Sequence, residues 1–441
     1  MQKVVSIQPE KVQESLRKHM LVDGFDMILD LDKSNHDYLY DSKSKKYLLD
    51  FFTFVASNPL GMNHPKLNNP EFINKIGKLA LNKPSLSDIY AQEQAEFVET
   101  FFNIAVPPYF VHSFFIEGGT LAVENAIKAA FDWKVQKNFT KGYKEEKGHQ
   151  IIHFKEAFHG RSGYTLSMTN TDPVKIAYFP KFNWPRVSNP KILFPLTDEN
   201  HAKVIESEKQ SIAEIKTAIS ENKDDIAAII LEPIQGEGGD NHFRKEFFMQ
   251  LRQICNENEI LLIFDEVQTG IALTGKWWAH QHFVKPDLIS FGKKTQVCGV
   301  LATDRMDEIE ENVFRKSSRI NSTWGGNIVD MYRFKRILEV IEEENLVENC
   351  RINGDYLKTK METLCNKYPD KITSPRGLGL FAAFDTSSTD LRNKITGEAL
   401  KNGLMILGCG SRSIRFRPPV TVTKEHIDEA FVILDKVINN L

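Results

Sequence analysis

Two carboxylates end an apolar run in the segment EILLIFDEVQTG, and two lysines end the next apolar run along the chain. Residues 260–264 predict a buried strand that stops at Asp265 and Glu266. Taking a carboxylate out of water is costly unless a cation or a hydrogen-bond donor meets it. The segment DLISFGKK then places Lys293 and Lys294 at the end of the following strand. We therefore expect an acid and an amine at neighbouring strand ends.

An acid and an amine in this arrangement fit the chemistry of pyridoxal 5'-phosphate (PLP). A lysine whose pKa falls below its free value of about 10.4 can form an imine with a carbonyl cofactor. An acid such as Asp265 can hold the pyridine nitrogen protonated, so that the ring draws electrons from a substrate carbanion. Each residue also has a structural alternative. Asp265 could cap a helix or join a buried ion pair, and the lysines could belong to a solvated loop.

Two other segments could hold the phosphate and the ring of such a cofactor. FFIEGGTLAVENAIK runs from a strand through Gly118 and Gly119 to Thr120 and a helix. Glycine lets the backbone approach closely, and a helix N-terminus offers free N–H groups to an anion. AFHGRSGY places Phe158 and His159 after a strand, where a flat ring could stack on a pyridine. An ordinary turn and core packing are the structural alternatives.

Further charged residues follow the same strands. Arg161 belongs to AFHGRSGY, and its guanidinium fork suits a carboxylate, although it could equally be a surface charge. The segment LEPIQGEGGD adds Glu232 and Glu237 after an apolar run. Three strand ends then carry acids, and such a group of like charges without a cation would be unfavourable as a purely structural feature. The pattern favours a binding site.

The middle of the chain alternates between buried-strand and helix patterns, which predicts an α/β fold with a mostly parallel sheet covered by helices on both faces. The candidate strands are 114–118, 151–155, 226–233, 260–266 and 287–293, and a long helix is predicted over 120–136. In sheets of this kind ligands bind at the carboxyl ends of the strands. All the candidate residues above lie at such ends.

The two ends of the chain have secondary-structure patterns that differ from that of the middle. Residues 37–52 predict a hairpin with a turn near 41–45, and the last third mixes amphipathic helices with short strands. We expect a large PLP-binding domain over 66–329 and a smaller α+β domain over 330–441. The N-terminal segment, residues 1–65, is expected to contribute to the small domain.

The composition excludes several classes of function. The chain has 441 residues, with 56 Lys and Arg against 59 Asp and Glu, so its net charge of -3 offers no broad field for nucleic acid or an anionic membrane. The five cysteines form no CxxC pair, which argues against a disulfide framework or a metal site. No segment reaches the roughly 20 apolar residues that cross a bilayer, and the N-terminus lacks the apolar core of a secretory signal. A cytoplasmic location is expected.

Taken together, the motifs resemble the class III (ω-amino acid) aminotransferases, which are fold type I PLP-dependent transferases. The resemblance spans nearly the whole chain, from YLYDSKSKKYLLDFF through EPIQGEGG, FDEVQTG and STWGGN to SIRFRPP. Within that family, EGGTLAVENAIKAAFDWK, AFHGRSGYTLSMTNT and FGKKTQVCGV look like the lysine ε-aminotransferase branch. The family has an acid where this chain has Leu121, and a glycine where it has Cys298.

The resemblance implies catalytic roles for two residues. Lys294, rather than Lys293, matches the Schiff-base lysine, because the family's glycine pair falls four and five residues later, here at Cys298 and Gly299. Asp265 matches the acid that pairs with the pyridinium. The residues expected to bind the cofactor in the same subunit are Gly119, Thr120, Phe158, His159, Glu232 and Gln268, the last beside the phenolic oxygen of the ring.

The remaining matches concern the substrate and the partner subunit. Thr323 matches a threonine that reaches the phosphate from the other subunit, so the resemblance implies a homodimer with shared sites. Arg161 and Arg415 match arginines that bind substrate carboxylates. Glu237 matches an acid that can pair with an arginine and switch away from it.

The implied reaction transfers the ε-amino group of L-lysine to 2-oxoglutarate, giving 2-aminoadipate 6-semialdehyde, which cyclises, and L-glutamate. Lysine reacts at its ε-amine, far from its carboxylate, whereas 2-oxoglutarate reacts at the keto carbon next to a carboxylate. One site must therefore bind two substrates whose carboxylates lie at different distances from the reacting atom. Other ω-amines such as ornithine or 4-aminobutyrate, a racemase, and a catalytically silent homologue of the same fold are the alternatives. A dinucleotide enzyme is poorly supported, because RGLGLFAA lacks the third glycine of that motif.

Overall fold

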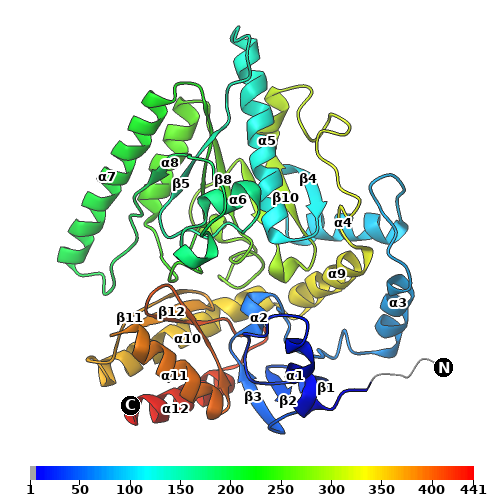
Figure 1. Ribbon diagram of the computed structural model, residues 1–441, viewed down its shortest axis with the longest axis vertical. Helices are drawn as coiled ribbons and strands as arrows, with labels where there is room; N and C mark the ends of the chain where they lie inside the picture. The colour runs from blue at the N-terminus through cyan, green and yellow to red at the C-terminus, as the bar shows by residue number, and fades with distance from the viewer. Residues whose placement is uncertain (1–5) are drawn as a thin grey trace.

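A seven-stranded sheet forms the centre of the computed structural model, which describes residues 6–441 (Figure 1). In spatial order its strands are β4 (Phe110–Ile116), β10 (Cys298–Thr303), β9 (Leu288–Phe291), β8 (Leu261–Asp265), β7 (Ile226–Leu231), β5 (Gln150–Phe154) and β6 (Arg186–Val187). The run from β9 to β6 is parallel, whereas β10 is antiparallel to both of its neighbours. The predicted mostly parallel α/β fold is confirmed.

Helices cover both faces of this sheet, and this explains why its strands are apolar throughout. Leu261 and Ile263 of β8 pack in a cluster with α5 (Gly119–Thr140) on one face. Leu262 and Phe264 point to the opposite face, in a cluster that includes α4 (Gln92–Ile104) and α8 (Lys245–Glu257). Because successive residues of a strand face opposite sides, a strand covered on both sides must be apolar at every position.

The remaining helices surround the sheets. Their bounds are α1 Val12–Arg17, α2 Thr53–Ala56, α3 Pro70–Ala80, α6 Gly163–Met168, α7 Asp198–Glu221, α9 Ile328–Glu343, α10 Leu346–Lys367, α11 Thr389–Lys401 and α12 Lys424–Asn439. Helix α9 packs against α4, where the ring of Phe334 lies 6.0 Å from that of Phe97. Across residues 6–441, no helix combines the length and the apolar character that crossing a membrane requires.

Two smaller sheets lie below the central sheet in the view of Figure 1. The first contains β1 (Leu29–Asn35), β2 (Tyr38–Asp41), β3 (Lys46–Asp50) and β13 (Leu404–Met405). The second contains β11 (Ile372–Leu378), β12 (Phe381–Thr386), β15 (Ser413–Phe416) and β14 (Leu407–Cys409). The predicted hairpin is confirmed as β2 and β3, and β3 pairs in parallel with β13 from the far end of the chain. The domain limits at 65 and 330 stay predictions.

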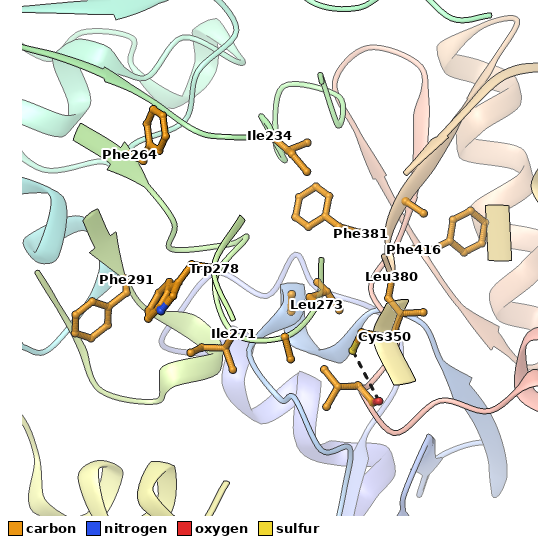
Figure 2. Close-up of a cluster of buried hydrophobic side chains, with 14 of the residues drawn as sticks. Ile234, Phe264, Ile271, Leu273, Trp278, Phe291, Cys350, Leu380, Phe381 and Phe416 are labelled. Atoms are coloured by element: carbon orange, nitrogen blue, oxygen red, sulfur yellow. Dashed lines mark hydrogen bonds between the residues drawn. The ribbon is translucent and has the colours of Figure 1, made fainter. Parts of the chain in front are cut away.

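One apolar core joins the central sheet to the C-terminal sheet. Figure 2 shows part of it, with Phe264 and Phe291 from the central strands on one side and Phe381 and Phe416 from the C-terminal strands on the other. Between them, Cys350 of α10 is buried, and its thiol donates to the carbonyl oxygen of Val420 at 3.9 Å. The carboxyl ends of the central strands and the C-terminal sheet are therefore held in a fixed relation.

Candidate active site

A cavity of about 790 Å³ lies at the carboxyl ends of β7 and β8. Its wall combines the central sheet, the N-terminus of α5 and the C-terminal strands. The lining residues that were predicted as site residues are Gly119, Thr120, Phe158, His159, Arg161, Glu232, Glu237, Asp265, Gln268 and Arg415. Two predicted residues, Lys294 and Thr323, are outside this lining.

Asp265 is the last residue of β8 and is buried, with 5% of its surface exposed. Its Oδ2 lies 2.8 Å from Nδ1 of His159, and its Oδ1 accepts from the backbone N–H of Val267 at 3.1 Å. Ser290 of the neighbouring strand donates to the same Oδ1 at 3.4 Å. Nε2 of His159 is buried without a hydrogen-bond partner among the described residues. A carboxylate held in this way can meet a cation from the cavity.

Glu232 follows β7 and lies beside Asp265 at the bottom of the cavity. Its two carboxyl oxygens accept from the backbone N–H groups of Phe158 at 3.0 Å and Gly236 at 3.1 Å. Complete burial, and secondly the negative charge of Asp265, raise the pKa of Glu232 well above its usual value. The raised pKa favours the neutral form of Glu232 relative to an exposed glutamate.

The N-terminus of α5 points at the same cavity. The helix begins at Gly119 after Gly118, whose φ of 97° suits glycine, and no side chain caps it. A Cβ added at Gly119 would lie 2.9 Å from Cγ1 of Val267, so the backbone and the Val267 side chain are in close contact there. Thr120 Oγ1 accepts from the backbone N–H of Arg161 at 3.1 Å. Uncapped N–H groups at a long helix are a ready site for a phosphate.

Gln268 is held by two residues that the sequence analysis did not select. Its Oε1 accepts from Nη2 of Arg417 at 3.0 Å, and Arg417 forms a buried ion pair with Asp240 at 2.6 Å. The guanidinium also lies 3.4 Å from the centre of the Phe381 ring. A signal was available in SIRFRPP, because Arg415 and Arg417 are two positions apart and so share one face of a strand.

The two adjacent lysines lie in different surroundings. Lys293 lines the cavity, and burial, followed by the positive charge of Arg415, lowers its pKa to about 8. Lys294 is 1% exposed, and its Nζ donates to the backbone carbonyl oxygen of Gln268 at 2.5 Å. Burial and then the charge of Lys293 hold the pKa of Lys294 well below its usual value. Both amines therefore lose a proton at lower pH than a free lysine does.

A carboxylate and an arginine face each other in the lining of the cavity. Glu237 pairs with Nη2 of Arg415 at 3.1 Å, and Arg415 is 3% exposed. The Nε and Nη1 atoms of Arg415 are buried without partners within residues 6–441. Arg161 is exposed, and its guanidinium lies 5.9 Å from the centre of the Phe158 ring. Two arginines on one cavity can bind both ends of a dicarboxylate.

Thr323 lies on an exposed loop between residues 321 and 327, away from the cavity lining of its own chain. The neighbouring Trp324 is 37% exposed, and the ammonium of Lys83 lies 4.4 Å from its ring centre.

The lining residues fit PLP on three observations. The uncapped start of α5, at Gly119 and Thr120, can take the phosphate. Asp265 is a buried carboxylate whose surroundings leave room for a ring nitrogen, and Phe158 offers an aromatic face beside it. A buried amine of lowered pKa lies near Gln268. These are the three parts that the cofactor requires.

The comparisons with known proteins identify the family of the chain. The aminotransferase class-III family model matches residues 21–438. The L-lysine-epsilon aminotransferase of Mycobacterium tuberculosis is 49% identical over 96% of this chain and 94% of its own length, and that of Streptomyces clavuligerus is 44% identical over 98% and 94%. A solved structure of lysine aminotransferase from M. tuberculosis has a TM-score of 0.96 at 47% identity, covering 98% of this chain and all of that one.

Proposed function

The chain belongs to the class III aminotransferases, and on that premise we propose that it transfers the ε-amino group of L-lysine to 2-oxoglutarate with PLP as cofactor. The products are 2-aminoadipate 6-semialdehyde, which cyclises, and L-glutamate. The observation that carries this proposal is one cavity that combines a buried acid at a strand end with two arginines and a glutamate paired with one of them. The similarity to relatives named for lysine ε-transamination supports the choice of amine donor.

When bound, PLP supplies a protonated ring that withdraws electrons from the carbon that loses its proton. The chain supplies the groups around that ring. Asp265 would hold the proton on the ring nitrogen, and His159 and Ser290 fix the orientation of its carboxylate. Burial raises the pKa of Glu232, which favours its neutral form beside Asp265. Gln268 would donate to an oxygen of the ring through its Nε2, since Arg417 already occupies its Oε1.

We assign the proton transfer to Lys294. Its lowered pKa favours the neutral amine, so Nζ can take the proton from the substrate carbon that bears the amino group and deliver it again later in the cycle. In the structure Nζ contacts the carbonyl oxygen of Gln268. For the proton transfer it would leave this oxygen and contact the substrate carbon. Lys293 would remain at the cavity wall.

The two substrates place different demands on the arginines. 2-Oxoglutarate has two carboxylates, which Arg161 and Arg415 can bind together once Glu237 leaves Arg415. Lysine has one carboxylate, and Glu237 then stays on Arg415, since an unpaired buried guanidinium would cost several kcal/mol, about 3–5. This exchange lets one cavity accept both substrates in turn.

We also propose that the chain forms a homodimer in which Thr323 of each subunit contributes to the phosphate site of the other. The exposure of Thr323 and Trp324 on a loop outside their own cavity supports this arrangement. A cytoplasmic location is part of the proposal. All five cysteines lie within residues 6–441, where each is buried and free, as expected in a reducing compartment.

The proposed donor is tested by incubating the PLP-loaded protein with lysine and 2-oxoglutarate. We expect equal amounts of glutamate and a cyclised imine, and faster cofactor conversion by lysine than by ornithine or 4-aminobutyrate. A 4-aminobutyrate aminotransferase of Caenorhabditis elegans is 34% identical over 94% of this chain, so 4-aminobutyrate is the sharpest competitor. Faster conversion by either competing amine would reassign the donor, and no conversion by any amine would favour a silent homologue.

A further inference from the structure

We propose that Lys175 is the second cationic partner of Glu237, which holds the carboxylate when a dicarboxylic substrate displaces it from Arg415. This inference rests on the proposed function, because it explains how Glu237 can leave Arg415. Lys175 ends the short helix η2 (Pro173–Lys175) in the segment between α6 and β6. It was not selected from the sequence.

Glu237 is shared between two cations in the structure. Its Oε1 accepts from Nζ of Lys175 at 2.6 Å, while its Oε2 lies 3.1 Å from Nη2 of Arg415. Burial by itself raises the pKa of Glu237, but the charge of Arg415 and the hydrogen bond from Lys175 outweigh it and leave the pKa lowered. Each carboxyl oxygen thus has its own partner, so the bond to Arg415 can break while the bond to Lys175 stays.

Arg415 is suited to such an exchange, because only part of its guanidinium is used. Its Nε and Nη1 are buried and have no partner within the described residues 6–441. A substrate carboxylate could bind these donors and then replace Glu237 at Nη2. A bidentate pair of this kind is stronger than the single contact that it replaces.

The position of Lys175 defines where the displaced carboxylate goes. Glu237 and Leu407 line the active-site cavity and also a second cavity of about 520 Å³. Lys175 lines this second cavity, together with Arg392 and Thr396, and is outside the lining of the first. A carboxylate that keeps Lys175 and releases Arg415 therefore moves out of the substrate volume.

The ammonium of Lys175 is held independently of Glu237. It lies 5.3 Å from the ring centre of Phe158 and 3.5 Å from Oγ1 of Thr171, and the side chain is 17% exposed. A cation over an aromatic face is stabilised by the ring. Lys175 can thus stay in the same position whether or not Glu237 is paired with Arg415. A residue that receives the displaced carboxylate must have this property.

The test uses PLP-loaded Lys175→Met, which removes the charge and keeps the length. Glutarate, a five-carbon dicarboxylate without a keto group, is the probe, and calorimetry gives its Kd. We expect Kd to rise about tenfold, because without Lys175 the displaced Glu237 has no cationic partner, whereas in the unliganded variant it still pairs with Arg415. Conversion by lysine should change less than about threefold, since lysine leaves Glu237 on Arg415. Lys175→Arg should restore glutarate binding.

Two controls separate this role from simpler ones. Lys181→Met alters a lysine of the same segment whose Nζ donates only to the backbone carbonyls of Ile176 and Phe179, and glutarate binding should be unchanged. In a Glu237→Gln background, Lys175→Met should no longer affect Kd, because the effect passes through Glu237. A persistent effect in that background, or an equal loss with lysine, would overturn the proposal.

Failure of the proposed function is distinguishable from failure of this inference. If the parent protein does not exchange amino groups between lysine and 2-oxoglutarate, the function fails. If the parent does so and Lys175→Met binds glutarate as tightly as the parent, the role of Lys175 fails alone.

Discussion

Lys293 and Lys294 are neighbours in the chain, but their ammonium groups point to different surroundings. Lys293 lines the cavity, whereas Lys294 contacts the carbonyl of Gln268 and is almost fully buried. Burial favours the neutral form of both amines, so a lowered pKa does not distinguish them. The spacing to Cys298 and Gly299 is what favours Lys294 as the cofactor-bearing residue.

Borohydride reduction distinguishes the two lysines directly. Reduction of the yellow PLP-loaded protein should fix the cofactor on one side chain, and peptide mass spectrometry should find it on Lys294. Fragment ions that separate the two positions are needed, because the residues are adjacent. A label on Lys293 would show that the amine lining the cavity is the reactive one, and the assignment would have to move by one residue.

His153, a buried residue of β5, makes stability depend on pH. Burial, and secondly the charge of Arg186, lower the pKa of His153 to about 3, against about 6.5 when unfolded. Between these values the unfolded chain binds more protons, so stability is lost as the pH falls below 6.5. His153→Gln should therefore lose less stability than the parent between pH 7 and pH 5, by about 2 kcal/mol. Urea denaturation at the two pH values measures this, and equal losses would contradict it.

The residues found from the sequence and those missed differ in a physical way. Asp265, Glu232 and Gln268 follow apolar strands, and the carboxyl ends of parallel strands meet at one edge. Lys175 and Asp240 act through single long-range ion pairs, to Glu237 and Arg417. No periodicity marks such a pair, because the two partners come from separate loops and strands.

At the scale of elements, the strands that are buried on both faces were predictable and β10 was not. Residues 226–231 and 261–264 are apolar at every position, and polar residues mark where these strands end. Strand β10 (Cys298–Thr303) begins five residues after Lys293, in a segment whose sequence is also compatible with a loop. Its antiparallel direction depends on its pairing with β4. Direction is set by the return path of the chain, which local sequence does not encode.

Gly160, in the connection between β5 and α6, should tolerate no side chain. Its φ is +129°, and a Cβ would lie 1.7 Å from Oγ1 of Thr120 at the start of α5. Gly160→Ala should lower the free energy of unfolding by about 2–4 kcal/mol, from strain and overpacking together. Gly142→Ala is the matched control, because Gly142 also has a positive φ of +96° but has open space around it. Urea denaturation should show that Gly142→Ala lowers the free energy of unfolding by about 1 kcal/mol. If both variants lost the same amount, the clash with Thr120 would not be the cause of the loss at Gly160.

At the scale of the whole molecule, sharing of the active site between subunits can be tested by complementation. Asp265→Asn should inactivate a subunit's own site, whereas Thr323→Ala should weaken the site of its partner. In a mixed dimer of the two variants, one site then carries both defects and the other carries neither. Refolding equal amounts together should restore about a quarter of the parent activity, since half of the dimers are mixed.

Each variant refolded alone is the control and should stay near its own low rate. Absence of recovery in a mixture that contains mixed dimers would mean that Thr323 serves its own subunit or none. The role of Thr323 could not be derived from the fold of one subunit. The loop that carries Thr323 lies on the surface, and the group it would contact belongs to another copy.

Strand β15 and the residue after it supply two arginines with separate duties, and this limits how the enzyme could be re-engineered. Arg415 faces the substrate end of the cavity, while Arg417 holds Gln268 and Asp240. A chimaera that borrows the C-terminal region of a relative to alter donor preference would replace both arginines at once. Such a graft would also need a residue that pairs with Asp240 and holds Gln268, as Arg417 does. Without that residue, the donor preference could change while Gln268 lost its anchor.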